Sequence, residues 1–185
     1  PQAFSTSSDF SHNLVKVMLS TLAHPPPGAP TVVTTGGIVW GAPLPASAGG
    51  AEVSQFLGVP FARAERWSPP VDFTGQYKQQ PLTATMWGRA CLQILDQGVS
   101  YGSEDCLQAN VWKPAGATPQ SQLPVLVFIY GGSNQFGEAE PYNMSGLAAF
   151  HNVVCVNFNY RTGRASTDLR THDLHSRPAR LQRLC

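Results

Sequence analysis

Two long apolar runs dominate the second half of the sequence. They span residues 123–130 (LPVLVFIY) and 153–158 (VVCVNF). Uninterrupted apolar residues are typical of strands buried on both faces, which occupy the centre of a sheet covered by helices. We therefore expect two central strands, with a short helix at residues 145–150 between them.

Shorter segments rich in β-branched residues fill the first half. Residues 31–35 and 38–40 flank a Gly-Gly pair at 36–37, which predicts a hairpin with its two-residue turn at the glycines. Residues 52–57 and 108–112 predict two further strands, which we expect to be antiparallel edge strands. The predicted fold class is α/β, in which antiparallel strands lead into the start of a mixed, mainly parallel sheet.

The two ends of the chain have a different character. Residues 1–30 are Ser-rich and then Pro-rich, which predicts an N-terminal extension with extended polyproline geometry at the three prolines 25–27. Within it, residues 13–23 favour a short amphipathic helix over the remnant of a signal peptide. The longest apolar run, residues 123–130, is far shorter than the roughly 20 residues of a membrane span, so none is expected.

Composition narrows the possible functions. The chain has 185 residues, 42% hydrophobic and only 12% charged, which excludes disorder of the highly charged kind. Its net charge of +1 hides an uneven distribution. Residues 1–160 carry six bases and nine acids, whereas residues 161–185 carry six arginines and two acids. A mildly acidic body with a basic tail does not predict nucleic-acid binding.

Five segments together resemble the type-B carboxylesterase/cholinesterase family of α/β-hydrolases. They are Gly36–Gly41; Phe56–Ala62 with Arg66–Pro70; Cys91–Gln93 with Ser103–Leu107 and Asn110–Trp112; residues 123–132; and Val153-Val154 with Asn159–Arg161. Their order and approximate spacing are those of the family. The resemblance covers residues 31–161 and corresponds to roughly the first quarter of such a catalytic domain. It implies a carboxylic ester hydrolase that acts on a small-molecule ester through a Ser acyl-enzyme and needs no cofactor or metal.

The resemblance also assigns a role to the turn after the first apolar run. In α/β-hydrolases this strand-to-loop turn supplies N–H donors of the oxyanion hole, which implies such donors at Gly131, Gly132 and Ser133. An ordinary tight turn at a strand end is the alternative. Ser133 stands where the family usually has a third glycine. That departure keeps open a second possibility, a non-catalytic cholinesterase-like adhesion or binding protein.

Further pairings follow from the resemblance. It implies a disulfide between Cys91 and Cys106, with two free thiols as the alternative, and a salt bridge between Arg66 and Glu104, with a solvated glutamate as the alternative. A disulfide implies an oxidising compartment, and the sequon at Asn143 agrees with secretion.

The two other cysteines have no expected partner. Cys155 lies within an apolar run, so we expect a buried, inert thiol, while Cys185 has no assigned partner.

One apparent catalytic triad is rejected. Residues 98–102 fit G-x-S-x-G around Ser100, and Asp168, His172 and His175 follow in the order of an α/β-hydrolase triad. The nucleophile elbow needs a strand that ends in a strained turn before a helix. Ser100 lies instead in a short loop between Cys91 and Cys106, and Ser103 is interpreted as a turn residue.

The family's nucleophile, acid and His correspond to positions beyond Arg161. We therefore expect no triad in this chain and no activity from it alone. Residues 162–185 resemble nothing in the family and are interpreted as a frameshift or a mis-joined exon; a genuine basic tail is the alternative. His172 and His175 have metal-ligand spacing, but no further ligands complete a site.

Overall fold

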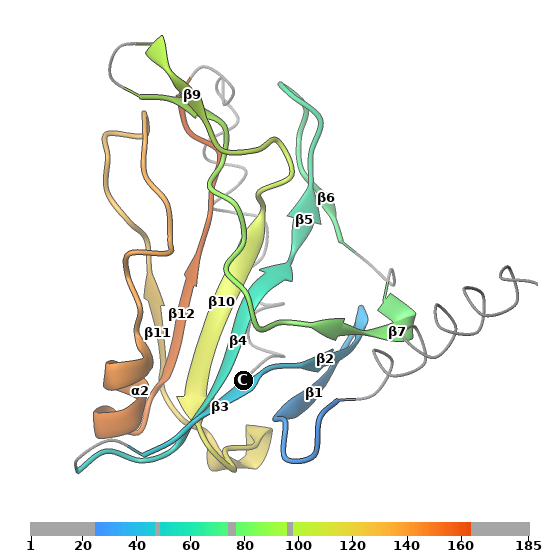
Figure 1. Cartoon of the computed structure of the whole chain (residues 1–185), viewed down its shortest axis with the longest axis vertical. Coiled ribbons are helices and arrows are strands. Elements are labelled where there is room, and N and C mark those ends of the chain that lie inside the picture. Colours follow the sequence, from blue (N-terminus) through green and yellow to red (C-terminus); the bar gives the residue numbers. More distant parts are fainter. Residues whose placement is uncertain (1–24, 47–48, 74–76, 96–97, 164–185) are drawn as a thin grey trace, which may run out of the picture.

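A five-stranded mixed sheet forms the centre of the molecule. The computed structural model describes residues 25–46, 49–73, 77–95 and 98–163 (Figure 1). In spatial order the strands of this sheet are β11 (Val125–Phe128), β12 (Val154–Phe158), β10 (Gln108–Pro114), β4 (Val53–Pro60) and β3 (Ala42–Leu44). Only β11 and β12 run parallel, and the other neighbours pair antiparallel.

A smaller sheet covers one face of the large one. It contains β1 (Thr31–Thr34), β2 (Gly37–Trp40) and β7 (Tyr77–Thr83), in the order β1-β2-β7. Val39 of this sheet packs with Phe56 and Val111 of the large sheet in a cluster in which all three are fully buried. The other face is covered by the helix α2 (Ser145–His151), which lies against β10, β12 and β4 (Figure 1).

Alternation along the central strands explains why they are buried on both faces. Phe56 and Val111 face the small sheet, whereas their neighbours Leu57 and Trp112 lie in the cluster of α2 with Met144. Successive side chains of a strand point to opposite faces, so both faces of β4 and β10 need apolar residues. The large sheet is therefore the middle layer between α2 and the small sheet.

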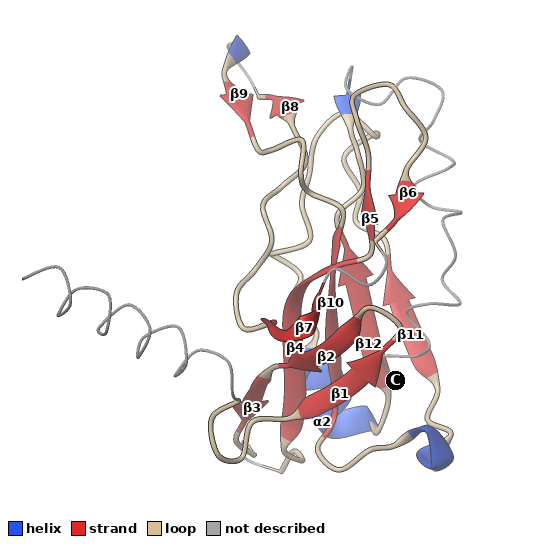
Figure 2. Ribbon diagram, turned by 90° about the vertical axis from the view of Figure 1, so that its right-hand side faces the viewer, coloured by secondary structure: helices blue, strands red, loops and turns tan. Residues whose placement is uncertain are grey.

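Four two-residue strands and a 3₁₀ helix complete the described structure. β5 (Ala62–Arg63) pairs with β6 (Val71–Asp72), and β8 (Gln93–Ile94) pairs with β9 (Ser100–Tyr101). Both pairs lie at the same end of the molecule, beyond the ends of the central strands (Figure 2). The 3₁₀ helix η2 covers Pro119–Ser121.

The structure confirms several predicted elements and corrects others. The hairpin of β1 and β2 and the helix at residues 145–150 are present. The hairpin turn, however, lies at Thr35-Gly36, because Gly37 already pairs with Thr34. Gly37 has a φ of +137°, and a side chain there would collide with the backbone of Tyr77. A glycine is therefore needed here because β7 packs closely against β2, and not because of the turn.

The expected places of the strands in the sheet were partly wrong. β4 and β10 were expected at edges but lie inside the large sheet, where neighbouring strands cover them on both sides. β12 is fully buried as predicted, but β11 is an edge strand and its Val125, Leu126 and Val127 are 40–46% exposed. The parallel part of the large sheet is thus a single strand pair in the residues described.

The proline-rich segment makes a turn instead of an extended polyproline stretch. The N–H of Ala29 donates to the carbonyl of Pro26 at 3.0 Å, and Gly28 has a φ of +82°. Proline followed by glycine at the two central positions is the preferred sequence of a type II turn, and this local preference decides the geometry. The predictions for residues 1–24 and 164–185 lie outside the described residues. In the part of the chain that is described, no helix has the length and apolar character that a membrane span requires.

Candidate oxyanion site

The loop that follows β11 reverses the chain within a few residues. The carbonyl of Gly132 accepts hydrogen bonds from the N–H groups of Gln135 (2.9 Å) and Phe136 (3.3 Å). Ser133 and Asn134 have left-handed backbone conformations, with φ of 54° and 58°. We call residues 131–137 the donor loop.

The two glycines at the start of the donor loop meet different constraints. Gly132 has a φ of +130°, and a Cβ at this position would collide with the carbonyl oxygen of Phe136. Gly131 has no positive φ, and no atom lies within 4 Å of the position where its Cβ would be. Only Gly132 is therefore required by the backbone.

The donor loop presents three consecutive backbone donors. Within the described residues, the N–H groups of Gly131, Gly132 and Ser133 donate no hydrogen bond. Gly131 and Ser133 are exposed residues and Gly132 is half-buried. Successive backbone N–H groups in tight turns form concavities that bind anions, and donors of this kind stabilise the oxyanion of acyl transfer.

Two buried tyrosines hold the start of the loop. The rings of Tyr130 and Tyr160 stack with their centroids 4.4 Å apart. The hydroxyl of Tyr160 donates to the carbonyl of Tyr130 at 2.6 Å, and the hydroxyl of Tyr130 donates to the carbonyl of Tyr160 at 3.3 Å. Burial raises the pKa of both phenols, so both remain neutral hydrogen-bond donors at physiological pH.

Buried asparagines hold the chain just beyond the loop. The N–H of Ala139 donates to Oδ1 of Asn159 at 2.8 Å, and Nδ2 of Asn157 donates to the carbonyl of Ala139 at 3.1 Å. Asn157 accepts in turn from Nδ2 of Asn110 at 2.8 Å. Sequence reasoning missed these residues, although a polar side chain at 157 inside an apolar run was the available signal.

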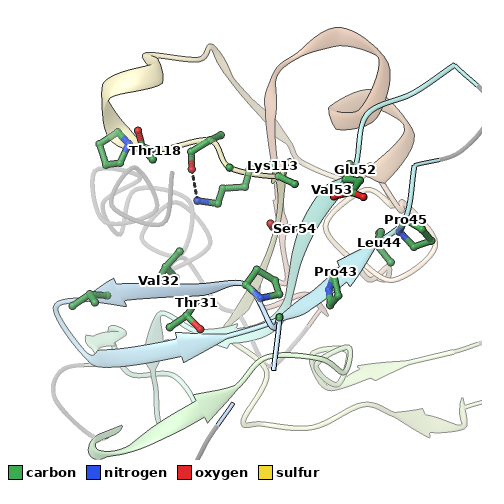
Figure 3. A pocket seen from close by; sticks show the side chains of 17 residues that line it. Thr31, Val32, Pro43, Leu44, Pro45, Glu52, Val53, Ser54, Lys113 and Thr118 are labelled. Carbon is green, nitrogen blue, oxygen red and sulfur yellow. Dashed lines mark hydrogen bonds between the residues drawn. The ribbon is translucent and has the colours of Figure 1, made fainter. Parts of the chain in front are cut away.

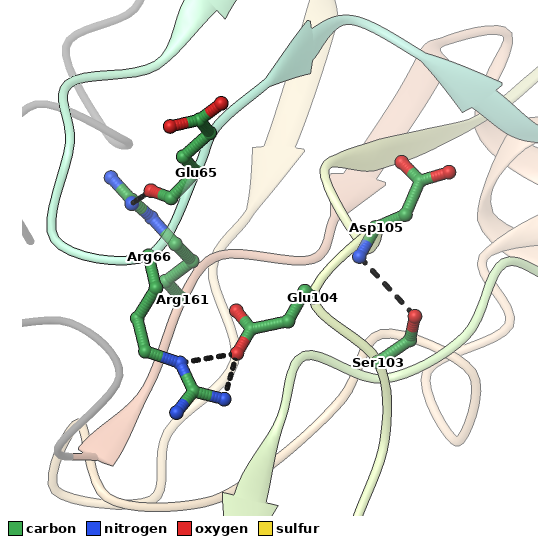
Figure 4. Close-up of polar contacts among 6 residues, drawn as sticks. All are labelled: Glu65, Arg66, Ser103, Glu104, Asp105 and Arg161. Atoms are coloured by element: carbon green, nitrogen blue, oxygen red, sulfur yellow. Dashed lines mark hydrogen bonds and ion pairs between the residues drawn. The ribbon is translucent and has the colours of Figure 1, made fainter.

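The cysteine pair and the ion pair implied by the resemblance are both present. The structure confirms the Cys91–Cys106 disulfide. It also places the guanidinium of Arg66 on the carboxylate of Glu104, with Nε 2.5 Å from Oε1 (Figure 4). The two side chains are 46% and 41% exposed, so this is a surface ion pair of small energetic value.

A second arginine was not singled out for a contact but is buried. Arg161 is only 3% exposed, and its NH1 donates to the carbonyl of Ser68 at 2.9 Å. It also donates to the carbonyl of Glu65 at 3.4 Å (Figure 4). It ties the end of β12 to the segment between β5 and β6.

The rejected nucleophile has none of the geometry of an elbow. Ser100 is exposed and begins β9, which pairs back onto β8. The next element along the chain is the strand β10, where an elbow would have a helix. Asp168, His172 and His175 lie outside the described residues. Ser103 is a turn residue as predicted, since its Oγ accepts the N–H of Asp105 at 3.2 Å.

The remaining candidates occupy simple positions. Cys155 is a free thiol and fully buried, and burial raises its pKa to about 11. Asn143 is exposed, and its Oδ1 accepts the N–H of Ser145 at 2.9 Å at the start of α2. Cys185 lies outside the described residues.

Among the described residues, neither a metal centre nor the cavity beside β1 and β3 coincides with the donor loop. Among the described residues, no group of three or more His, Cys, Asp or Glu could hold a metal ion. A cavity of about 710 Å³ lies at the other end of the large sheet, between β1, β3 and the residues after β10 (Figure 3). In its wall, Nζ of Lys113 donates to the carbonyl of Ala117 at 2.8 Å.

Comparison with known proteins assigns the family. The sequence model of the carboxylesterase family matches residues 28–166. The chain belongs to this family. The resemblance carried by the five segments is therefore confirmed, and the carboxylesterase family has the α/β-hydrolase fold, with which the mixed sheet agrees.

Curated relatives cover most of this chain but are much longer. Mouse bile salt-activated lipase is 39% identical over 143 residues, which are 71% of this chain and 24% of the lipase. A duck medium-chain fatty acyl-CoA hydrolase precursor is 37% identical over 169 residues, or 80% of this chain and 29% of the relative. Rabbit cocaine esterase is 39% identical over 132 residues, which are 61% of this chain and 24% of the esterase. The chain thus spans about a quarter of the length of these relatives.

Proposed function

We propose that this chain carries the oxyanion-hole loop of a carboxylic ester hydrolase. The observation that carries the proposal is a run of three N–H groups, at Gly131, Gly132 and Ser133, that donate to no described residue. The run begins three residues after β11, a strand of the large sheet. The relatives reported above are named as a lipase, a fatty acyl-CoA hydrolase and an esterase. A small-molecule carboxylic ester is therefore the proposed substrate class.

The proposed chemistry is acyl transfer through a Ser acyl-enzyme. When the nucleophile attacks the ester carbonyl, the carbonyl oxygen becomes negatively charged. The N–H groups of the donor loop stabilise that charge. One such donor contributes about 2.7–4 kcal/mol to the transition state. Ser100 does not supply the nucleophile, so we propose that the 185-residue chain alone does not hydrolyse esters. Hydrolysis of an aryl acetate above background, lost in Ser100→Ala, would contradict this.

A non-catalytic binding protein is the second candidate. Ser133 favours it, because the family's third glycine is replaced by a residue held at a φ of 54°. A side chain here restricts how the donors can turn toward a substrate. The two candidates differ in whether the donor loop recognises an oxyanion.

Titration with a stable oxyanion distinguishes the two candidates. The ¹⁵N-labelled chain is titrated with methylphosphonate, with sodium chloride at equal ionic strength as the control. The ester-hydrolase proposal expects saturable shifts at the amides of Gly131, Gly132 and Ser133. Shifts that are absent, or that chloride reproduces, would favour the binding protein.

Secretion is proposed on separate grounds. The disulfide needs an oxidising compartment, and Asn143 is exposed within a sequon. Expressed in a secreting eukaryotic cell, the chain is expected to lose mass on treatment with an N-glycosidase, and Asn143→Gln to abolish that loss. An unglycosylated secreted chain would remove Asn143 from the proposal but leave the disulfide argument intact.

A further inference from the structure

A buried glutamine joins the disulfide loop to the donor loop. Gln93 lies in β8, two residues after Cys91, and is only 4% exposed. Its Oε1 accepts the N–H of Gly137 at 2.7 Å, and its Nε2 donates to the carbonyl of Gly137 at 3.1 Å. The second Nε2 hydrogen goes to the carbonyl of Cys91 at 3.0 Å. The amide therefore pairs with Gly137 as a neighbouring strand would, and both its donors and its acceptor are used.

Gly137 is the point at which the donor loop closes on itself. Its φ is +128°, and a Cβ there would lie 2.8 Å from two ring atoms of Tyr130 and 2.9 Å from the carbonyl oxygen of Gly131. The backbone of Gly137 thus touches the residues from which the three donors begin. A displacement of Gly137 must change the path of the loop at Gly131, because no space remains between them.

A disulfide cross-links the frame to which Gln93 belongs. Cys91 is bonded to Cys106, and β8 pairs with β9 inside the loop that this disulfide closes. A second contact, from the hydroxyl of Tyr101 to the carboxylate of Glu138 at 3.1 Å, is exposed. Of the two contacts, the buried one has the larger energetic effect, because a buried polar group left unpaired costs more than an exposed one.

We propose that Gln93 is a positioning residue that holds the donor loop closed, so that the N–H groups of Gly131, Gly132 and Ser133 are presented together. It acts through Gly137 and does not touch a ligand. What the donors bind rests on the proposed function, but the coupling from Gln93 to the loop does not.

Two substitutions of Gln93 test the coupling, with one matched control. Gln93→Leu removes all three hydrogen bonds at similar size. Gln93→Glu keeps the acceptor for the N–H of Gly137, but its ionised form has no hydrogen for the carbonyls of Gly137 and Cys91. Tyr101→Phe, the control, removes only the exposed contact between the same two loops. Amide hydrogen exchange and ¹⁵N chemical shifts are measured in each oxidised chain.

Protonation of the introduced glutamate supplies a readout that a loss of stability would not produce. The neutral carboxyl donates through its O–H to the carbonyl of Gly137 while its other oxygen accepts the N–H, so the pair re-forms at low pH. Among the described residues, the titratable groups near this site include Tyr101, Glu138 and Glu140. The hydrogen bond with Glu138 is the largest cause that raises the pKa of Tyr101, and the charge of Glu140 adds to it. Tyr101 and Glu138 are both present in the wild type, so the wild-type and Tyr101→Phe series report any pH dependence that does not come from the introduced glutamate.

The expected result is specific to the loop. Gln93→Leu exchanges the Gly137 amide about tenfold faster or more and shifts the amides of Gly131–Ser133 at all pH values. Gln93→Glu resembles Gln93→Leu near pH 8 and approaches the wild type near pH 4, whereas Tyr101→Phe resembles the wild type throughout.

Other outcomes overturn the proposal. Unchanged amides at 131–133 in Gln93→Leu would show that Gln93 does not position the donors. If Gln93→Leu does not fold, the Gln93→Glu series decides. A Gln93→Glu chain that is unfolded at every pH, or whose amides at 131–133 do not change with pH, would show that Gln93 is a purely structural residue. A wild type that fails to bind methylphosphonate, with the Gln93 coupling present, would contradict the proposed function alone.

Discussion

Gly131 and Gly132 of the donor loop are adjacent in the sequence but differ in whether their backbone position tolerates a side chain. A Cβ on Gly132 would meet the carbonyl of Phe136 at a positive φ, whereas a Cβ on Gly131 meets open space. Gly132→Ala should therefore lower the free energy of unfolding by about 1–3 kcal/mol, the cost of a strained backbone. Gly131→Ala should change it by less than about 0.5 kcal/mol. Urea unfolding followed by Trp fluorescence measures both, and equal effects would contradict the loop geometry.

The buried thiol predicts a pH dependence with a definite sign. Burial raises the pKa of Cys155 to about 11 in the folded chain, above its ordinary value of 9.0. The folded state thus keeps the proton that the unfolded state loses. The stability this contributes is complete below pH 9 and is lost as the pH rises to about 11, by at most about 3 kcal/mol.

Comparison with Cys155→Ala isolates this effect. Tyr130 and Tyr160 titrate in both proteins, so their contribution cancels in the difference between the two unfolding free energies. We expect that difference to shrink between pH 9 and pH 11. A difference that stays constant over this range would show that the thiol is less buried than the structure has it.

At the scale of elements, β11 is the exposed edge of the large sheet. Val125, Leu126 and Val127 are each at least 40% exposed and carry no charge. Such an edge pairs readily with other chains. We expect Leu126→Lys to reduce self-association in sedimentation velocity runs at increasing concentration. Ile94→Lys is the control, because Ile94 is 60% exposed but lies in β8, away from that edge. An equal effect of both lysines would point to net charge, not to β11.

The same strand marks the limit of what the sequence predicts about the fold. The apolar runs that became β11 and β12 have the same pattern, and that pattern identifies both as strands. Whether a strand is central depends on which strands pair with it on each side. The hydrophobicity of its own residues does not determine those neighbouring strands. The hairpin of β1 and β2 and the helix α2 were predictable, because their glycine turn and short spacing are local signals.

The candidate site divides in the same way. Gly131 and Gly132 follow a strand and could be singled out from the sequence. Gln93 could not, because its importance comes from Gly137, 44 residues away, and a single glutamine carries no local signal for a distant partner. The asparagines at 157 and 159 were visible as polar residues in or after an apolar run, but their acceptors and donors were not.

At the scale of the whole molecule, one covalent and one ionic link hold the same region. The disulfide joins residues 15 positions apart, and a loop of that length contributes about 3 kcal/mol in the chain-entropy description. The ion pair of Arg66 and Glu104 is nearly half exposed on both sides, and such pairs contribute less than about 1 kcal/mol.

These magnitudes predict which link determines the stability of the chain. Replacing Cys91 and Cys106 together by alanine should lower the free energy of unfolding by about 3 kcal/mol, whereas replacing Arg66 and Glu104 together should lower it by less than about 1 kcal/mol. Urea unfolding measures both, and only the ionic variant should respond to added salt, because salt screens exposed charges. If the ionic variant proved the more costly, Arg66 would have a packing role that its exposure does not suggest.

Since Gln93 lies inside the disulfide-closed loop, the cysteine variant should also speed exchange of the Gly137 amide, which links the stability of this region to the donor loop.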